Sequence, residues 1–122
     1  MRLTAFVAFL AAMVLVGCES GGGTEVFVDP HGAIRVKPGT TFALSLPENP
    51  GVGFEWRLSR RPEGGVVQST GDAHGASHAA PGSGGRHRFL FRARRTGRAT
   101  VGLRESFRGR PRAERTVTVE VR

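Results

Sequence analysis

The stretch ENPGVGFEW, residues 48–56, joins a tight turn to the start of a strand. Pro50 restricts the backbone of Asn49 to extended geometry, and the glycines admit backbone angles that other residues avoid. Phe54 and Trp56 then alternate with a polar residue, which is the pattern of a strand that buries one face. The stretch therefore predicts a stiff loop that is tied to the core through the only tryptophan of the chain.

The same two-residue period runs on both sides of this stretch, from Thr24 to the C-terminus. No window has the 3.6-residue period of a helix, and Pro- and Gly-rich turns separate the runs. The sequence predicts an all-β domain, an immunoglobulin-like β-sandwich of about seven to eight strands, with a closed barrel as the alternative. The expected core-facing sets are Val26/Val28, Ile34/Val36, Phe42/Leu44/Leu46, Phe54/Trp56/Leu58, Phe89/Phe91/Ala93, Val101/Leu103 and Val117/Val119/Val121.

One segment, STGDAHGASHAAPGSGG at residues 69–85, interrupts the regular spacing and reads as a long loop. It contains His74 and His78, but a Gly-rich loop does not hold two histidines at a helical spacing. Asp72 is the only acid near them, so the sequence predicts solvated histidines, and no metal ion or cofactor is expected. No nucleophile elbow or clustered catalytic set appears either, so the domain is expected to bind rather than to catalyse.

The N-terminus has the features of an export signal. The apolar run LTAFVAFLAAMVLVG ends at Cys18, and Leu15-Val16-Gly17-Cys18 resembles the bacterial lipoprotein processing box. We expect residues 1–17 to be a signal peptide, residues 18–23 a lipidated cysteine with a flexible tether, and residues 24–122 the folded domain. The protein would then be exported and lipid-anchored to a bacterial membrane in the cell envelope. The alternatives are a cleaved signal with an incidental cysteine and a spanning anchor, which the short run disfavours.

The charge is strongly positive, with 18 Lys and Arg against 10 Asp and Glu. The arginines alternate with apolar residues along the expected strands, most clearly in residues 86–94. This alternation is typical of the solvated face of a sheet, whereas a nucleic-acid site would gather the charges with stacking aromatic residues. The sequence therefore argues against nucleic acid as a partner.

Three motifs together resemble those of the chagasin family, small inhibitors of papain-like cysteine peptidases with an immunoglobulin-like fold. Residues 49–54, followed by Trp56, resemble its N-P-T-T-G-[YF]-x-W signature. Residues 82–85 resemble its G-x-G-G loop, and Arg110-Pro111 resembles its R-P-[WF] loop. The chain departs from the pattern where Gly51-Val52 replace the two threonines and where Arg112 replaces the aromatic residue.

The resemblance implies a reversible, non-covalent inhibitor of papain-like cysteine peptidases, a monomer that occludes the active-site cleft with three loops and uses no cofactor. The alternatives are an envelope lipoprotein that binds another, acidic partner through Arg108, Arg110 and Arg112, and a purely structural envelope domain. The expected peptidase-binding residues are Asn49, Pro50, Gly51, Val52, Gly53 and Phe54 in the first loop, Gly82, Ser83, Gly84 and Gly85 in the second, and Arg110, Pro111 and Arg112 in the third.

Overall fold

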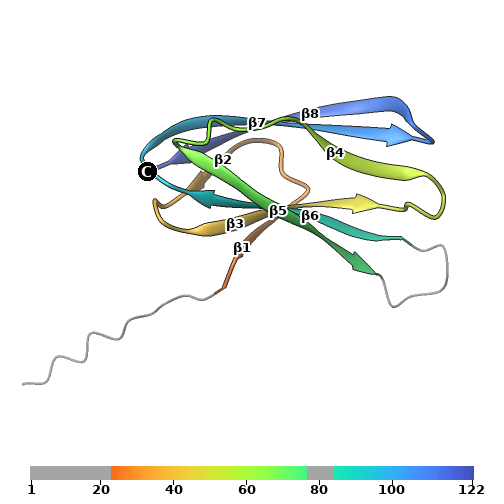
Figure 1. Ribbon diagram of the computed structural model, residues 1–122, viewed down its shortest axis with the longest axis horizontal. Coiled ribbons are helices and arrows are strands. Elements are labelled where there is room, and N and C mark those ends of the chain that lie inside the picture. Colours follow the sequence, from red (N-terminus) through yellow and green to blue (C-terminus); the bar gives the residue numbers. More distant parts are fainter. Residues whose placement is uncertain (1–22, 77–83) are drawn as a thin grey trace, which may run out of the picture.

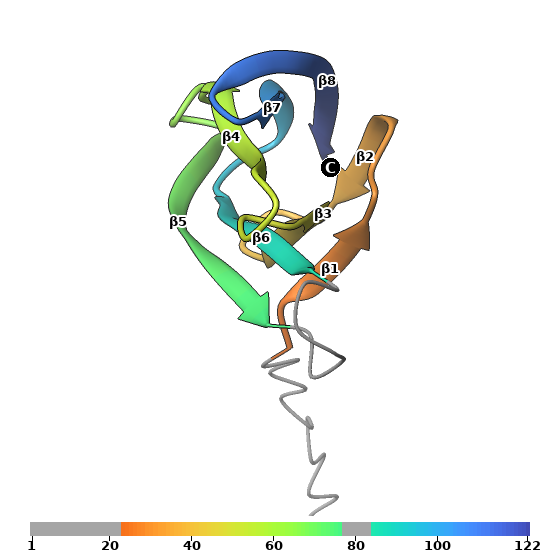
Figure 2. The ribbon, with the colours of Figure 1, turned by 90° about the vertical axis from the view of Figure 1, so that its right-hand side faces the viewer.

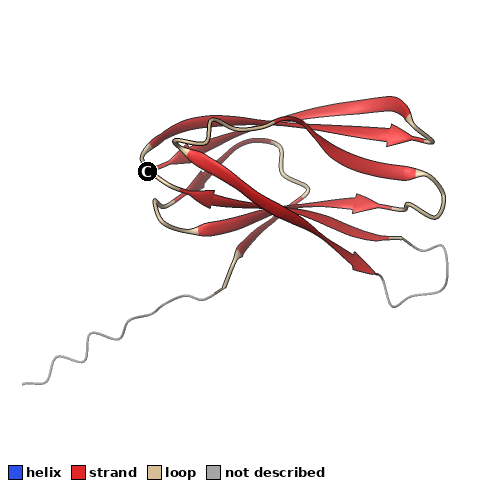
Figure 3. Ribbon diagram, viewed as in Figure 1, coloured by secondary structure: helices blue, strands red, loops and turns tan. Residues whose placement is uncertain are grey.

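A computed structural model describes residues 23–76 and 84–122, and within these ranges the regular secondary structure is entirely β (Figure 3). The expected signal peptide, the lipidation site Cys18, and Gly82 and Ser83 of the second loop lie outside the described residues. Within the described ranges, no helix is long and apolar enough to cross a membrane.

In the described part of the chain, eight strands form two four-stranded sheets, one with the order β1-β3-β6-β5 and the other with the order β2-β8-β7-β4. The sheets face each other as two layers (Figures 1 and 2), which confirms the predicted all-β sandwich. The pairs β1/β3 and β2/β8 are parallel, and the remaining neighbours are antiparallel. The strands are β1 (Glu25–Val28), β2 (Gly32–Val36), β3 (Thr41–Glu48), β4 (Phe54–Arg60), β5 (Val67–Ala76), β6 (Gly85–Ala93), β7 (Gly97–Phe107) and β8 (Arg110–Val121).

The core lies between the two layers and is built from alternate residues of the central strands. Phe42 and Phe91 are paired across β3 and β6, and their rings stack with centroids 5.3 Å apart. Complete burial of an aromatic or branched side chain contributes roughly 1.5–3 kcal/mol, so the alternation seen in the sequence holds the layers together. The buried hydrophobic residues that pack together as the core are Val36, Phe42, Leu44, Leu46, Trp56, Val67, Phe89, Phe91, Ala93, Ala99, Val101, Leu103, Val117, Val119 and Val121.

The prediction of a long loop over residues 69–85 is wrong at both ends. The first part of that segment belongs to β5, which continues to Ala76, and β6 already begins at Gly85. β5 is an edge strand whose residues 71–75 are exposed, so it pairs through its backbone without an alternating apolar face. A register shift between Ser69 and Gly71 marks a bulge in this strand.

The first strand also buries the opposite face from the one predicted. Val26 and Val28 are 37% and 62% exposed. Phe27 points inward instead, with its ring 6.2 Å from that of Phe42 in an edge-to-face arrangement. A phenylalanine side chain is larger than either valine and gains a ring contact with Phe42 on the inner face, and the strand accordingly buries Phe27.

Candidate functional site

The first loop, defined here as residues 49–53, is closed by its own backbone. The Asn49 carbonyl accepts hydrogen bonds from the backbone N–H groups of Val52, Gly53 and Phe54, each at 3.0 Å. The N–H of Asn49 in turn donates to the Phe54 carbonyl at 3.0 Å, so the two ends of the loop are bridged. The loop is therefore ordered without a partner, and Val52, 43% exposed, lies on it as an accessible apolar side chain.

The third loop is the two-residue hairpin turn Arg108–Gly109 between β7 and β8, and it contacts the first loop directly. Both residues have positive φ, 49° and 79°, as a type I′ hairpin turn requires. The Arg108 N–H donates to the Gly53 carbonyl at 2.9 Å. A Cβ at Gly53, whose φ is +109°, would lie 2.8 Å from Cγ of Arg108. The absence of a side chain at Gly53 is thus what lets the two loops touch.

Four side chains form a continuous stack beside these loops. The rings of Phe54 and Phe107, which pair across β4 and β7, have centroids 4.7 Å apart. The guanidinium of Arg108 lies over the Phe107 ring at 5.1 Å, and that of Arg112 lies over the Phe54 ring at 4.9 Å. Cation–π contacts of this kind contribute about 0.5–1 kcal/mol at exposed sites. Phe54 therefore anchors the loop in this end cluster, whereas Trp56 reaches the main core as predicted.

The third loop lies earlier in the chain than predicted. Arg110 and Pro111 are the first residues of β8, and the turn itself is Arg108–Gly109. The pairing jumps from Ser106–Pro111 to Glu105–Ala113, which leaves Arg112 as the extra residue of a bulge. Arg112 is 57% exposed, and its Nε is 3.8 Å from Oε1 of Glu105, so its guanidinium is paired with a carboxylate of the neighbouring strand.

The second loop joins β5 to β6, and its described part, Gly84 followed by Gly85 at the start of β6, lies against the base of the first loop. Gly84 has a φ of +81°, and a Cβ there would lie 2.7 Å from the backbone oxygen of Glu48. Glu48 and Gly85 are paired across β3 and β6. The first loop is consequently bracketed by Gly84 on one side and by Arg108 on the other. Figure 1 shows the β3–β4 and β7–β8 connections at one end of the sandwich, away from the C-terminus, and Figure 2 views that end.

A polar cluster of Glu48, His87, His74 and Asp72 lies next to the first and second loops, with the first two side chains buried and the last two exposed on the edge strand β5. Nδ1 of His74 and Oε1 of Glu48 are 2.5 Å apart, and Nε2 of His87 is 2.8 Å from Oδ2 of Asp72. The side chains of Glu48 and His87 are only 4% and 6% exposed. The hydrogen bond to Glu48 raises the pKa of His74 above its usual value, partial burial opposes this shift, and the charges of Glu48 and Asp72 add to it. His74 is therefore a strand residue paired with Glu48 and not a loop residue as predicted, although its side chain is 59% exposed, in agreement with the predicted exposure. His78, the second histidine of that prediction, lies outside the described residues.

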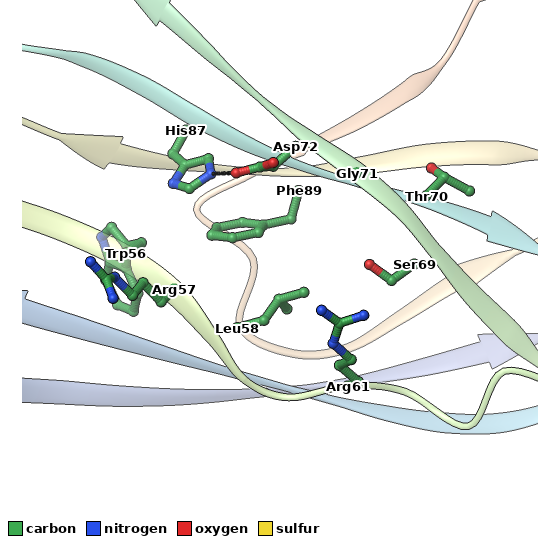
Figure 4. A pocket seen from close by; sticks show the side chains of 10 residues that line it. All are labelled: Trp56, Arg57, Leu58, Arg61, Ser69, Thr70, Gly71, Asp72, His87 and Phe89. Atoms are coloured by element: carbon green, nitrogen blue, oxygen red, sulfur yellow. Dashed lines mark hydrogen bonds and ion pairs between the residues drawn. The ribbon is translucent and has the colours of Figure 1, made fainter.

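A pocket of about 490 Å³ opens between β4 and β5, beside this cluster (Figure 4). The figure shows His87 turned towards Asp72, with Phe89 below them and Trp56 on the facing strand. The pocket gives solvent access to the otherwise buried His87. Its lining residues are Trp56, Arg57, Leu58, Arg61, Ser69, Thr70, Gly71, Asp72, His87 and Phe89.

The sequence analysis did not identify Phe107, Glu48 or His87 as residues that build this end of the molecule, and it considered Arg108 only as a charge for an acidic partner. The turn at Arg108 was missed because an arginine with positive φ carries no turn signal in the sequence. Glu48 and His87 escaped because alternation predicts only which face a residue occupies and not which residues from other strands lie beside it.

Comparison with known proteins finds one matching family and several solved structures of the same fold. Residues 35–121, more than half of the chain, match the family model described as Chagasin family peptidase inhibitor. A search of curated protein sequences finds no match. Solved structures that share the fold include the cysteine protease inhibitor EhICP2 from Entamoeba histolytica, with a TM-score of 0.66, 16% identity, and coverage of 81% of this chain and 96% of that one. Amebosin gives a TM-score of 0.64 and 24% identity over 83% of this chain and all of its own. PbICP-C, determined in complex with falcipain-2, gives a TM-score of 0.52 and 12% identity over 82% of this chain and 93% of its own.

Proposed function

Because the chain belongs to the chagasin family of peptidase inhibitors, we propose that it inhibits papain-like cysteine peptidases reversibly and without a covalent bond. Membership confirms the sequence-based prediction of an inhibitor as opposed to an enzyme. The structure of the relative PbICP-C in complex with falcipain-2 supports the choice of peptidase class for testing.

The observation that carries the proposal is the preordered first loop. Three backbone N–H groups converge on the Asn49 carbonyl, and the neighbouring loops hold both flanks through Gly84 and Arg108. Ordering a flexible loop on binding costs about 0.5–1.5 kcal/mol for each immobilised side chain, and this loop has already met that cost in folding. It can therefore enter a cleft with little further loss of entropy.

In the proposed complex the first loop fills the peptidase cleft and the other two loops contact its margins. Val52 supplies an apolar contact near the catalytic residues of the peptidase. The second loop, with Gly82, Ser83, Gly84 and Gly85, contacts one margin. The β7–β8 hairpin contacts the other through Arg108, Arg110, Pro111 and Arg112. The first loop is a turn closed by its own hydrogen bonds and does not have the extended shape of a substrate peptide. It therefore blocks the cleft by its shape, and no covalent bond to the peptidase needs to form.

A titration of the purified protein against papain tests the proposal. We expect competitive inhibition with a defined inhibition constant, activity that returns on dilution, and an inhibitor that remains intact after incubation. Absence of inhibition at micromolar protein against several papain-like peptidases would contradict it.

Replacement of Arg112 by tryptophan is expected to tighten inhibition of papain by about tenfold, or about 1.4 kcal/mol. The guanidinium already lies 4.9 Å over the Phe54 ring, so an indole can occupy the same place and add apolar contact at the rim. The salt dependence should also fall, because one charge leaves the group that includes Arg108 and Arg110, whose attraction is screened over about 10 Å at 0.1 M salt. The measurement is the inhibition constant of both proteins at low and high salt.

The matched control is Arg35→Trp, which places the same side chain on an exposed position of β2. It should leave both the inhibition constant and its salt dependence unchanged. An unchanged constant for Arg112→Trp would remove this bulge from the interface.

We further propose that residues 1–17 are a signal peptide and that Cys18 is lipidated, so that residues 18–23 tether the domain of residues 24–122 to a bacterial membrane. The support is the Leu15-Val16-Gly17-Cys18 processing box, together with the polar, Gly-rich segment that follows it. Several acyl chains on one residue, at about 0.8 kcal/mol for each buried methylene, would anchor the domain durably.

Expression in a bacterium fed a palmitate analogue is expected to label the wild-type protein and to recover it in the membrane fraction. Cys18→Ala should lose the label, because the thiol that accepts the diacylglyceryl group is gone. Equal labelling of Cys18→Ala would show that the cysteine is not the attachment site.

A further inference from the structure

We propose that Glu48, His74 and His87 form a binding site for one divalent transition-metal ion of the zinc class, with Asp72 as the residue that orients His87. One carboxylate oxygen or imidazole nitrogen from each of the three residues lies within 4.8 Å of the others. Two imidazoles and one carboxylate are a donor set that zinc uses in proteins. The proposal concerns a site outside the loops and does not depend on peptidase inhibition.

Two buried atoms point to a cation. Oε2 of Glu48 and Nδ1 of His87 lie 3.4 Å apart, and neither has a hydrogen-bond partner among the described residues. Both side chains are more than nine-tenths buried. A buried polar atom without a partner costs roughly 1–3 kcal/mol, so a cation bound between these two atoms would remove that cost. A separation of 3.4 Å also matches the roughly 3.4 Å edge of a tetrahedron with metal–ligand bonds of about 2.1 Å.

Asp72 sets the tautomer that this site requires. A carboxylate accepts and does not donate, so the 2.8 Å contact between Oδ2 of Asp72 and Nε2 of His87 places the ring hydrogen on Nε2. In the neutral ring, Nδ1 then carries the lone pair, and it lies 3.4 Å from Oε2 of Glu48. Histidines that bind metals characteristically donate their other N–H to a carboxylate in this way. The dashed line in Figure 4 marks this contact at the wall of the pocket.

The fold explains why the three ligands meet. His74 and His87 are paired across β5 and β6, and their rings are 4.0 Å apart. Glu48 is paired with Gly85, which has no side chain that could separate the carboxylate from His87. Ligands around one ion lie at most about 4.2 Å apart, so the cluster must contract slightly, and the half-exposed His74 ring is the ligand that can move. The ion would join three adjacent strands at the bases of the first and second loops.

The test is a calorimetric titration of ZnCl₂ into the full chain carrying Cys18→Ser, after dialysis against a chelator. The cysteine is replaced so that its thiol cannot bind the metal. We expect the titration to give one Zn²⁺ per chain and no binding of Mg²⁺, which prefers oxygen ligands. In a thermal unfolding experiment, Zn²⁺ should raise the unfolding midpoint, and a chelator should reverse this increase. Because the readout is binding, failure of this proposal and failure of peptidase inhibition are separate results.

Variants assign the ligands. His74→Ala and Glu48→Gln should each weaken Zn²⁺ binding at least tenfold, and Asp72→Asn should weaken it by about 10- to 100-fold. The His74 side chain is exposed, so its loss should not impair folding. The His74 variant therefore tests the site even if a change at the buried Glu48 unfolds the domain. His31→Ala removes an exposed histidine outside the cluster and should leave binding unchanged. No saturable binding to the Cys18→Ser chain, or equal binding to a Glu48→Gln/His74→Ala double variant, would mean an adventitious ion only and overturn the proposal.

Discussion

Replacing Gly53 by valine is expected to weaken inhibition of papain by about 100-fold, or about 2.7 kcal/mol, and to destabilise the domain by about 2 kcal/mol. Gly53 has a φ of +109°, a backbone conformation that a β-branched residue rarely adopts. Its new Cβ would meet Cγ of Arg108 at 2.8 Å and the Arg108 backbone nitrogen at 3.4 Å. The first loop and the β7–β8 hairpin must then separate, and the hydrogen bond from Arg108 to the Gly53 carbonyl is lost. Inhibition constants and urea unfolding of both proteins measure the two effects.

Gly51→Val is the control for this change, because it adds the same side chain two residues earlier in the same loop. A Cβ at Gly51 meets only the Asn49 side-chain oxygen, at an ordinary 3.7 Å, and its φ is not positive. Stability should change by less than about 0.5 kcal/mol and inhibition by only a few-fold. If Gly53→Val inhibits as well as Gly51→Val does, loop geometry is not what determines inhibition.

Much of the fold could be predicted from the sequence because six of the strands, all except β1 and β5, turn alternate apolar residues towards the core. β3 is the clearest case, since Phe42, Leu44 and Leu46 are all fully buried. β5 could not be predicted in this way. It is an edge strand with exposed, polar and glycine-rich residues. It is held by backbone pairing with β6, and such pairing leaves no periodic pattern of apolar residues in the sequence.

The parts of the candidate site that depend on local turn residues could be predicted from the sequence. The parts that depend on the register between paired strands could not. The first loop follows from Pro50 and its neighbouring glycines, and the Gly84 position follows from the need for positive φ. The His74–His87 pair depends on the bulge between Ser69 and Gly71. Without that extra residue His74 would face Arg86, since pairing before the bulge matches Ser69 with Phe91. A one-residue slip exchanges the faces of a strand, and no local motif in the sequence fixes it.

The position of the third loop could not be predicted from local sequence either. Its sequence motif drew attention to Arg110 and Pro111, but the chain reverses at Arg108 and Gly109. Only the glycine of that pair is a usual residue for a type I′ turn. The Phe107–Phe54 contact and the hydrogen bond to Gly53 compensate for the positive φ of Arg108, and both are tertiary interactions.

The second large effect is expected for Gly84→Ala, which should weaken papain inhibition by about 30-fold and destabilise the domain by about 2 kcal/mol or more. Part of the destabilisation is conformational, because an alanine with a φ of +81° is disfavoured by roughly 1–2 kcal/mol. The remainder comes from the new Cβ, which would lie 2.7 Å from the Glu48 backbone oxygen. A backbone atom cannot rotate away as a side chain can, so the second loop must move off the base of the first.

Gly39→Ala separates these two contributions. Gly39 has nearly the same φ, +82°, but a Cβ there meets nothing within 4 Å, and the turn lies at the other end of β3 from the first loop. It should therefore show the conformational destabilisation of roughly 1–2 kcal/mol and leave the inhibition constant of papain unchanged. The difference between the two variants isolates the contact between Gly84 and Glu48. If both variants lose the same stability and both still inhibit papain like the wild type, the second loop does not support the first, and the first loop and the β7–β8 hairpin alone must account for inhibition.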